Sequence, residues 1–156
     1  MTSRVKNGLL AGLSATVVVA AVEAVNMFVL KMFPAFPLMV AKMFGMPGNV
    51  AAGWAIHIFM GVVVLGLAFA FLYDRLPTKV PTAKGIAFAV GTWVLLMGYA
   101  IMVVPDQKLL PSGGLEIIGW MLATHAIFGA VLGSTYGRLL RQDKMHVHPV
   151  GAAPAH

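Results

Sequence analysis

Four long apolar runs dominate this 156-residue chain and leave few folds open to it. They cover residues 8–33, 50–73, 85–104 and 115–136. Each is about 20 residues or longer, enough for a helix to cross a hydrocarbon core about 30 Å thick. Pro34, Pro77 and Pro105 interrupt the chain after the first three runs. The sequence therefore predicts an all-α integral membrane four-helix bundle.

The composition agrees with lipid as the solvent of this chain. Apolar residues make up 60% of the sequence and charged residues only 10%, whereas soluble domains contain about 25% charged residues. We expect residues 1–140 to form one four-span transmembrane domain in contact with the lipid bilayer. Residues 141–156 are polar and contain Pro and Ala, so we expect a disordered cytoplasmic tail.

The positive charge is placed as in a membrane protein. The net charge of +6 would also suit a nucleic-acid-binding protein, but the cations flank apolar runs and form no stripe, so we expect no nucleic acid partner. With the N-terminus inside, the inner segments hold eight of the 11 Lys and Arg residues, namely Arg4, Lys6, Arg75, Lys79, Lys84, Arg138, Arg141 and Lys144. The outer segments then hold Lys31, Lys42 and Lys108. The positive-inside rule predicts that both termini are cytoplasmic.

The two ends of the first run bear on this topology. Arg4 and Lys6 before an apolar stretch also fit a secretory signal peptide, but the hydrophobicity continues to Phe33, so we favour an uncleaved span. In the predicted orientation, Trp54 and Trp120 lie near the outer ends of the second and fourth spans, where aromatic side chains anchor helices at the interface.

The second and fourth runs resemble each other. Both contain a Gly-Trp pair, a His-x-x-x-Gly motif and a final Tyr-x-Arg motif: Gly53-Trp54, His57, Gly61, Tyr73 and Arg75 in one, and Gly119-Trp120, His125, Gly129, Tyr136 and Arg138 in the other. The match needs a two-residue insertion between Trp120 and His125. It predicts two similar helical hairpins related by an axis along the membrane normal.

Glycines at a four-residue spacing predict close helix contacts. Small residues in membrane helices let two backbones approach each other. The glycines that we assign to helix packing are Gly53, Gly61, Gly129, Gly133 and Gly137. His57 and His125 continue these glycine lines, so we expect both histidines to face the protein interior.

A few polar residues inside the spans form the candidate site: Glu23, Asn26, His57 and His125. An ionised side chain at mid-membrane costs ~3 kcal/mol or more, so each should turn away from lipid. Measured from Trp54 and Trp120, the depths of the two histidines differ by only ~3 Å. We therefore predict that Glu23, His57 and His125 share one intramembrane site.

Four uses of this site are open. In the one we favour, Glu23 hydrogen-bonds a histidine and fixes the helix register. In the second, His57 and His125 hold haem b, with a glycine one turn away that leaves room for the ring. In the third, they bind a transition metal with Glu23 as carboxylate ligand. In the fourth, the acid and the imidazoles relay protons or ions.

The function that follows is non-enzymatic. The chain has no cysteine, which excludes disulfides and thiolate metal sites, and it has no nucleophile–base set, phosphate loop or dinucleotide motif. We predict a small polytopic membrane protein that acts as a homo-oligomer or as an accessory subunit of a larger membrane complex. The alternative is an intramembrane haem or transition-metal redox protein, and a small proton or ion transporter is the second alternative.

The chain also resembles a group of small bacterial four-span inner-membrane proteins with no established activity. The residues that carry the resemblance are Phe36-Pro37-Leu38, Gly53-Trp54, His57, Gly61, Gly119-Trp120, His125 and Gly129. The resemblance covers most of the chain up to Arg141. It implies that the protein lies in a bacterial plasma (inner) membrane, and it implies no cofactor or reaction.

Overall fold

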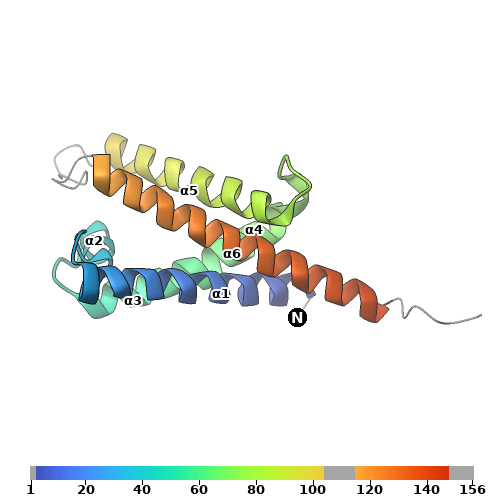
Figure 1. Ribbon diagram of the computed structural model, residues 1–156. Coiled ribbons are helices and arrows are strands. Elements are labelled where there is room, and N and C mark those ends of the chain that lie inside the picture. The colour runs from blue at the N-terminus through green and yellow to red at the C-terminus, as the bar shows by residue number, and fades with distance from the viewer. Residues whose placement is uncertain (1–2, 104–114, 148–156) are drawn as a thin grey trace, which may run out of the picture.

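A computed structural model describes residues 3–103 and 115–147, which form helices with short connections and contain no strand (Figure 1). In chain order the elements are α1 (Ser3–Val25), η1 (Asn26–Leu30), α2 (Phe36–Met43), α3 (Val50–Phe59), η2 (Met60–Leu65), α4 (Gly66–Leu72), η3 (Tyr73–Arg75), α5 (Pro81–Val103) and α6 (Leu115–Val147). The expected loop around Lys108 and the end of the tail, from His148, lie outside the described residues.

Four helical segments are long and apolar enough to cross a membrane. They are Ser3–Leu30, Val50–Arg75, Pro81–Gly98 and Leu115–Met145. Each overlaps one of the four predicted apolar runs. The all-helical prediction is confirmed for the described residues, and the four segments indicate a multi-pass membrane protein.

The longest helix, α6, lies between α5 and α1 (Figure 1). α1 packs against α6 and also against η2 and α4, which belong to the second span. Large apolar side chains point away from these contacts; Phe28 on η1 is 73% exposed and Leu95 on α5 is 74% exposed. Such exposure would be unfavourable in water but suits helices surrounded by lipid.

Glycines permit backbone contact at two of these interfaces. A Cβ built at Gly8 would collide with the backbone of Gly66, where α1 meets α4. A Cβ at Gly129 or Gly133 on α6 would collide with the backbone of Gly85 or Pro81 on α5. No side chain separates the helices there, so their backbones form dispersion contacts. These contacts matter in lipid, where the hydrophobic effect does not drive helices together.

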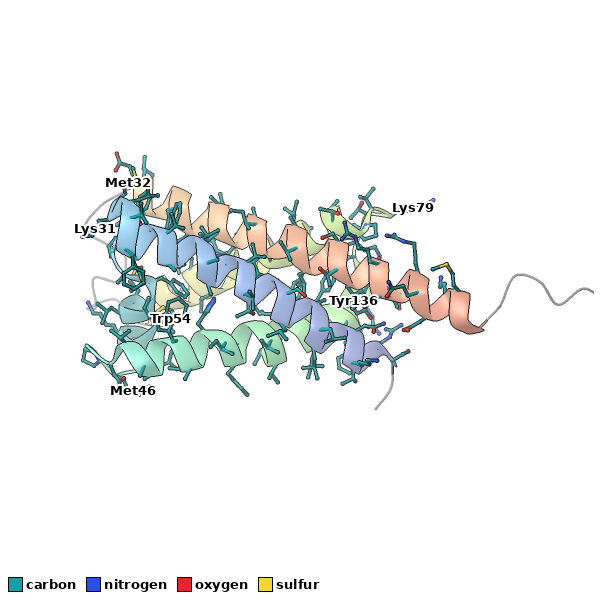
Figure 2. The ribbon with its side chains drawn as sticks, turned by 60° about the horizontal axis from the view of Figure 1, so that its bottom comes forward. Lys31, Met32, Met46, Trp54, Lys79 and Tyr136 are labelled. Carbon is teal, nitrogen blue, oxygen red and sulfur yellow. The ribbon has the colours of Figure 1, made fainter. Side chains whose placement is uncertain are left out.

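Aromatic residues form the core at one end of the bundle. Phe69, Phe88 and Tyr136 are buried together, and the ring centroids of Tyr136 and Tyr73 are 4.8 Å apart. We call this end, which holds Arg4, Lys79 and Tyr136, the basic end. We call the opposite end, which holds Lys31 and Trp54, the tryptophan end; Figure 2 shows the two.

Polar contacts join different helices at the basic end. The Arg4 guanidinium on α1 forms an ion pair with Asp74 on η3, with 2.6 Å between the nitrogen and oxygen atoms. The Asn7 amide donates to the Asp143 carboxylate on α6 at 2.7 Å. The Lys84 ammonium on α5 donates to the Tyr73 carbonyl and lies over the Tyr73 ring. These contacts tie α1, η3, α5 and α6 together where the helices leave the apolar region.

At the tryptophan end the chain folds back onto itself. Lys31 adopts a left-handed conformation, with φ of 51°, and ends the first span. The following α2 packs against α3, and its Pro37 and Ala41 are buried. The backbone carbonyl of Pro37 occupies the space that a side chain at Gly53 would need. The segment between the first two spans is therefore part of the protein core at this end.

The last helix is longer than expected. We expected the fourth span to end at residue 136 and a disordered tail from residue 141, but α6 continues to Val147. Its final turns are polar, and the hydrogen bond from Asn7 to Asp143 links them to α1. Hydropathy marks the end of the apolar run, whereas a helix continues as long as its residues tolerate it and find contacts.

Candidate functional site

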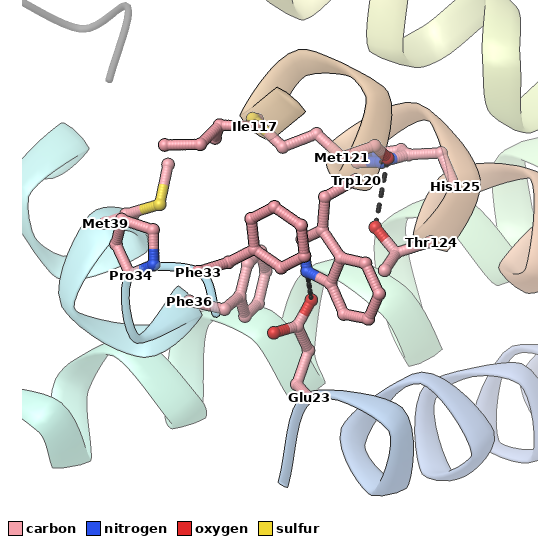
Figure 3. Close-up of a pocket in the computed structure, with 10 residues that line it drawn as sticks. All are labelled: Glu23, Phe33, Pro34, Phe36, Met39, Ile117, Trp120, Met121, Thr124 and His125. Atoms are coloured by element: carbon pink, nitrogen blue, oxygen red, sulfur yellow. Dashed lines mark hydrogen bonds between the residues drawn. The ribbon is translucent and has the colours of Figure 1, made fainter. Parts of the chain in front are cut away.

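A buried carboxylate and a tryptophan connect the first and last spans (Figure 3). Glu23 on α1 is only 1% exposed. The indole nitrogen of Trp120 on α6 donates a hydrogen bond to Glu23 Oε1 at 3.1 Å. The other carboxylate oxygen, Oε2, is buried without a hydrogen-bond partner among the described residues. One of the two carboxylate oxygens thus links α1 to α6.

A small pocket lies beside this pair. Its volume of about 10 Å³ is roughly the space of one water molecule. The lining residues come from α1, α6 and the segment that folds back at the tryptophan end: Glu23, Phe33, Pro34, Phe36, Met39, Ile117, Trp120, Met121, Thr124 and His125. Phe33 stacks on Trp120 with 4.8 Å between ring centroids, which holds the indole against the carboxylate.

His125 lines this pocket but is bonded to its own helix. Its Nδ1 lies 2.7 Å from the backbone carbonyl of Met121, one turn earlier. An N–H at Nδ1 donating to that carbonyl leaves Nε2 with the lone pair of the neutral ring. The ring centroid of Trp93 on α5 is 6.4 Å from that of His125. The histidine therefore lies between α5 and the pocket.

His57 lies next to the pocket and not in its lining. Its ring meets Phe36 and Trp54 edge to face, at centroid distances of 4.8 and 5.9 Å. Its Nε2 is buried without a hydrogen-bond partner among the described residues. Phe36 both contacts His57 and lines the pocket with Glu23 and His125.

Asn26 has a separate, local use. Its side-chain amide donates to the Phe33 carbonyl at 3.2 Å, and its carbonyl oxygen accepts from the Phe33 amide at 3.1 Å. This pair of bonds closes the turn after the first span. Asn26 is completely buried, so the turn satisfies its polar groups inside the protein. It is not among the residues that line the pocket.

All five glycines assigned to packing lie against another element. Gly53 meets Pro37 and Gly61 meets Thr16, whereas Gly129, Gly133 and Gly137 meet the N-terminal part of α5. Trp54 and Trp120, which we assigned to the membrane interface, both contact polar side chains of the candidate site. Trp120 thus serves as a hydrogen-bond donor inside the protein, and Trp54 as a ring contact of His57.

The dimensions of the site restrict what it can hold. A haem needs a flat cavity on the scale of other cofactor pockets, about 300 Å³ or more. The pocket beside Glu23 and His125 has about 10 Å³, so haem would have to push the helices apart. For a metal ion, the described residues contain no group of three or more His, Cys, Asp or Glu side chains with suitable spacing. The residues present therefore fit neither group as they are arranged.

Two features escaped the sequence analysis. The bond from Trp120 to Glu23 was missed because tryptophan near a helix end was assigned to the lipid interface; its depth, close to that of Glu23, was the available signal. A second cavity, at the basic end, was missed because its residues come from four separate segments. The sequence shows the charged residues of this cavity, but it does not show that the fold brings them together.

Comparison with known proteins places the chain in a family. No curated protein and no solved structure matches it. Residues 2–147 match the family model described as a family of unknown function, DUF6789. This match covers all four spans. The chain is therefore a member of the DUF6789 family.

Proposed function

We propose that this chain is a non-enzymatic accessory subunit of a larger membrane complex. Its role is to present a packed helical surface to a partner within the bilayer. The observation that carries the proposal is a set of glycines that have no packing partner within residues 3–103 and 115–147.

Three glycines in the spans face open space. A Cβ built at Gly91 or Gly98 on α5, or at Gly119 on α6, meets no atom of another described segment within 4 Å. The packing glycines described above all collide with a neighbour under the same construction. Glycine weakens a helix by about 1 kcal/mol relative to alanine, so its use needs a reason. In membrane helices the usual reason is the close approach of another helix.

The helix that carries two of these glycines has a free side. In the described residues α6 is the main neighbour of α5. Val94 and Leu95 lie between Gly91 and Gly98 and are 54% and 74% exposed. A partner helix seated on this side would contact the two glycines and bury both large side chains. The same contact would give this part of α5 a neighbour in addition to α6.

The polar site fits a structural role better than a chemical one. Glu23 joins α1 to α6 through Trp120, and Asn26 closes a turn. A redox protein would need space for haem or a third metal ligand, and a transporter would need a continuous polar path. A pocket of about 10 Å³ supplies neither. A purified protein with a Soret band or stoichiometric metal would favour the redox alternative.

We also propose that the halves of the chain are structural repeats. Gly8 packs on Gly66 in the first half, and Gly85 packs on Gly133 in the second. Tyr73 and Tyr136, which match each other in the two halves, are in ring contact. Such pairing supports two similar hairpins related by an axis along the membrane normal.

The proposed assembly predicts a specific effect of filling the open glycines. Gly91→Leu combined with Gly98→Leu should overpack the partner interface by about 1–3 kcal/mol and release the chain from its complex. Native gel electrophoresis of membranes solubilised in mild detergent should show wild type in a larger assembly. The double variant should shift toward the 16.5 kDa monomer.

The matched control adds the same kind of bulk elsewhere on the lipid-facing surface. Ala21 on α1 and Ala55 on α3 are exposed, so Ala21→Leu with Ala55→Leu should leave the assembly intact. A wild-type protein that migrates as a monomer would refute the proposal. Equal assembly of the glycine variant and wild type would refute it as well.

We propose that the protein lies in a bacterial inner membrane with both termini in the cytoplasm. The charge bias between the two sides supports this orientation. An alkaline phosphatase reporter fused after His156 should be inactive, and a fluorescent reporter at the same place should be active. Fusion after Gly48, between the first two spans, should give the reverse. Phosphatase activity after His156 would rule out this topology.

A further inference from the structure

A cavity of about 340 Å³ lies at the basic end of the bundle. Its lining comes from α1, η3, α5 and α6: Arg4, Tyr73, Asp74, Pro81, Tyr136, Gly137, Leu140, Arg141 and Lys144. This volume falls within the range of about 300–1,000 Å³ that small-molecule sites occupy. The pocket beside Glu23 has no comparable space. The cavity plays no part in the function proposed above.

The lining carries an excess of positive charge. Arg4, Arg141 and Lys144 face one carboxylate, Asp74, so three positive charges and one negative charge leave +2. Asp74 is paired with Arg4. Asp143, the other nearby acid, accepts a hydrogen bond from Asn7. Arg4–Asp74 is the one ion pair in residues 3–103 and 115–147, so none neutralises Arg141 or Lys144 there.

The walls of the cavity combine this charge with apolar and aromatic surface. Tyr73 and Tyr136 supply phenol rings, and Pro81 and Leu140 supply aliphatic surface. Pro81 is the first residue of α5, so the positive end of that helix dipole also lies at the cavity. Gly137 keeps α5 close, because a Cβ there would collide with the Pro81 ring. This combination suits a ligand with an anionic group beside an apolar part.

The cavity lies where segments able to span the membrane begin or end. Asp74 and Pro81 are at the end of the second span and the start of the third, and Lys144 is at the end of the fourth. At this depth the hydrocarbon gives way to phosphates and water. Basic pockets between membrane helices bind the head groups of anionic lipids, and a guanidinium forms paired hydrogen bonds with phosphate oxygens.

We propose that this cavity binds the phosphate group of an anionic phospholipid, with Arg141 and Lys144 as its principal cations. The apolar wall then contacts the glycerol end of the same lipid. The bound lipid bridges α1, α5 and α6. The inference is independent of the accessory role, because it rests on a different end and a different surface of the molecule. A soluble phosphate compound would be recognised by the same chemistry, and the experiment below distinguishes it from a lipid.

The test is lipid retention by the purified full-length chain. Native mass spectrometry in detergent, with equal amounts of phosphatidylglycerol and phosphatidylcholine added, should show selective retention of phosphatidylglycerol. Each cation near an anionic lipid changes the affinity about 5-fold, so Arg141→Gln with Lys144→Gln should weaken phosphatidylglycerol binding roughly 30-fold. Phosphatidylcholine binding should change little, since its head group has no net charge.

Two variants separate the cavity from overall charge. Lys79→Gln with Arg138→Gln removes the same charge from exposed residues that do not line the cavity, and should retain wild-type binding. Asp74→Asn removes the acid from the lining and should strengthen phosphatidylglycerol binding. Equal retention of both lipids by wild type would overturn the proposal. So would an equal loss in the control and the cavity variant.

Inorganic phosphate distinguishes the two sources of the ligand. For a lipid site, millimolar phosphate should neither raise the thermal midpoint of the protein nor displace phosphatidylglycerol. Phosphate that does both, and does so only when Arg141 and Lys144 are present, would overturn the lipid assignment in favour of a soluble phosphate compound. Charge alone is checked by Arg141→Lys with Lys144→Arg, which should retain most of the lipid binding.

Discussion

Replacing Gly129 by leucine is expected to cost about 3 kcal/mol of stability, at the upper end of overpacking effects. A Cβ at this position would already collide with the carbonyl of Gly85 and with the backbone of Ile86. These neighbours are main-chain atoms, which cannot move aside by changing a rotamer. The variant must therefore separate α5 from α6. Thermal unfolding of the purified protein in detergent should show a clearly lowered midpoint.

The same substitution at a glycine without such a contact provides the control. Gly91→Leu adds an identical side chain to α5 where the described residues leave open space. It should not lower the midpoint of the isolated chain, because leucine favours helix more than glycine by about 0.8 kcal/mol. Gly129→Ala should fall between the two variants. Equal midpoints for Gly129→Leu and Gly91→Leu would show that the close approach of α5 and α6 is wrong.

Glu23→Ala is expected to be the second most damaging change, at about 2–3 kcal/mol. The substitution removes a side chain that is 1% exposed and leaves the Trp120 indole N–H without its acceptor. Glu23→Gln keeps a carbonyl oxygen of the same reach, so it should cost less than about 1 kcal/mol. Thermal or denaturant unfolding of both variants in detergent measures the difference.

A double-mutant cycle isolates the contact between the two residues. Glu23→Ala, Trp120→Phe and the double variant together should give a coupling energy of about 0.6–2 kcal/mol. Phenylalanine retains the ring that stacks on Phe33 and removes only the donor. Additive effects of the two single changes would mean that the hydrogen bond contributes nothing to stability.

The spans were predictable because hydropathy and length are properties of contiguous residues and do not depend on tertiary contacts. The runs at residues 8–33 and 50–73 coincide closely with the segments Ser3–Leu30 and Val50–Arg75. Inside lipid a chain has almost no alternative to a helix, so length and apolarity suffice. The glycine spacing similarly marked Gly129 and Gly133, which lie where two backbones meet.

The candidate site was only partly accessible to the same reasoning. Depth along a helix predicted that Glu23, His57 and His125 lie near one another. It did not predict which group meets which, because small differences in helix rotation and the fold-back of residues 31–43 decide that. Phe36 comes from this fold-back and lies against His57, and Trp120 reaches Glu23 instead of a histidine. Asn26 is used in a turn that no periodic pattern marks.

The order of synthesis gives the one-sided packing of α5 a further consequence. Its main neighbour, α6, emerges from the ribosome only later. The glycine contacts of α5 with α6 can therefore form only after the fourth span has been synthesised. Synthesis of the last span thus completes the packing of the third, when the backbones of Gly85 and Gly129 meet.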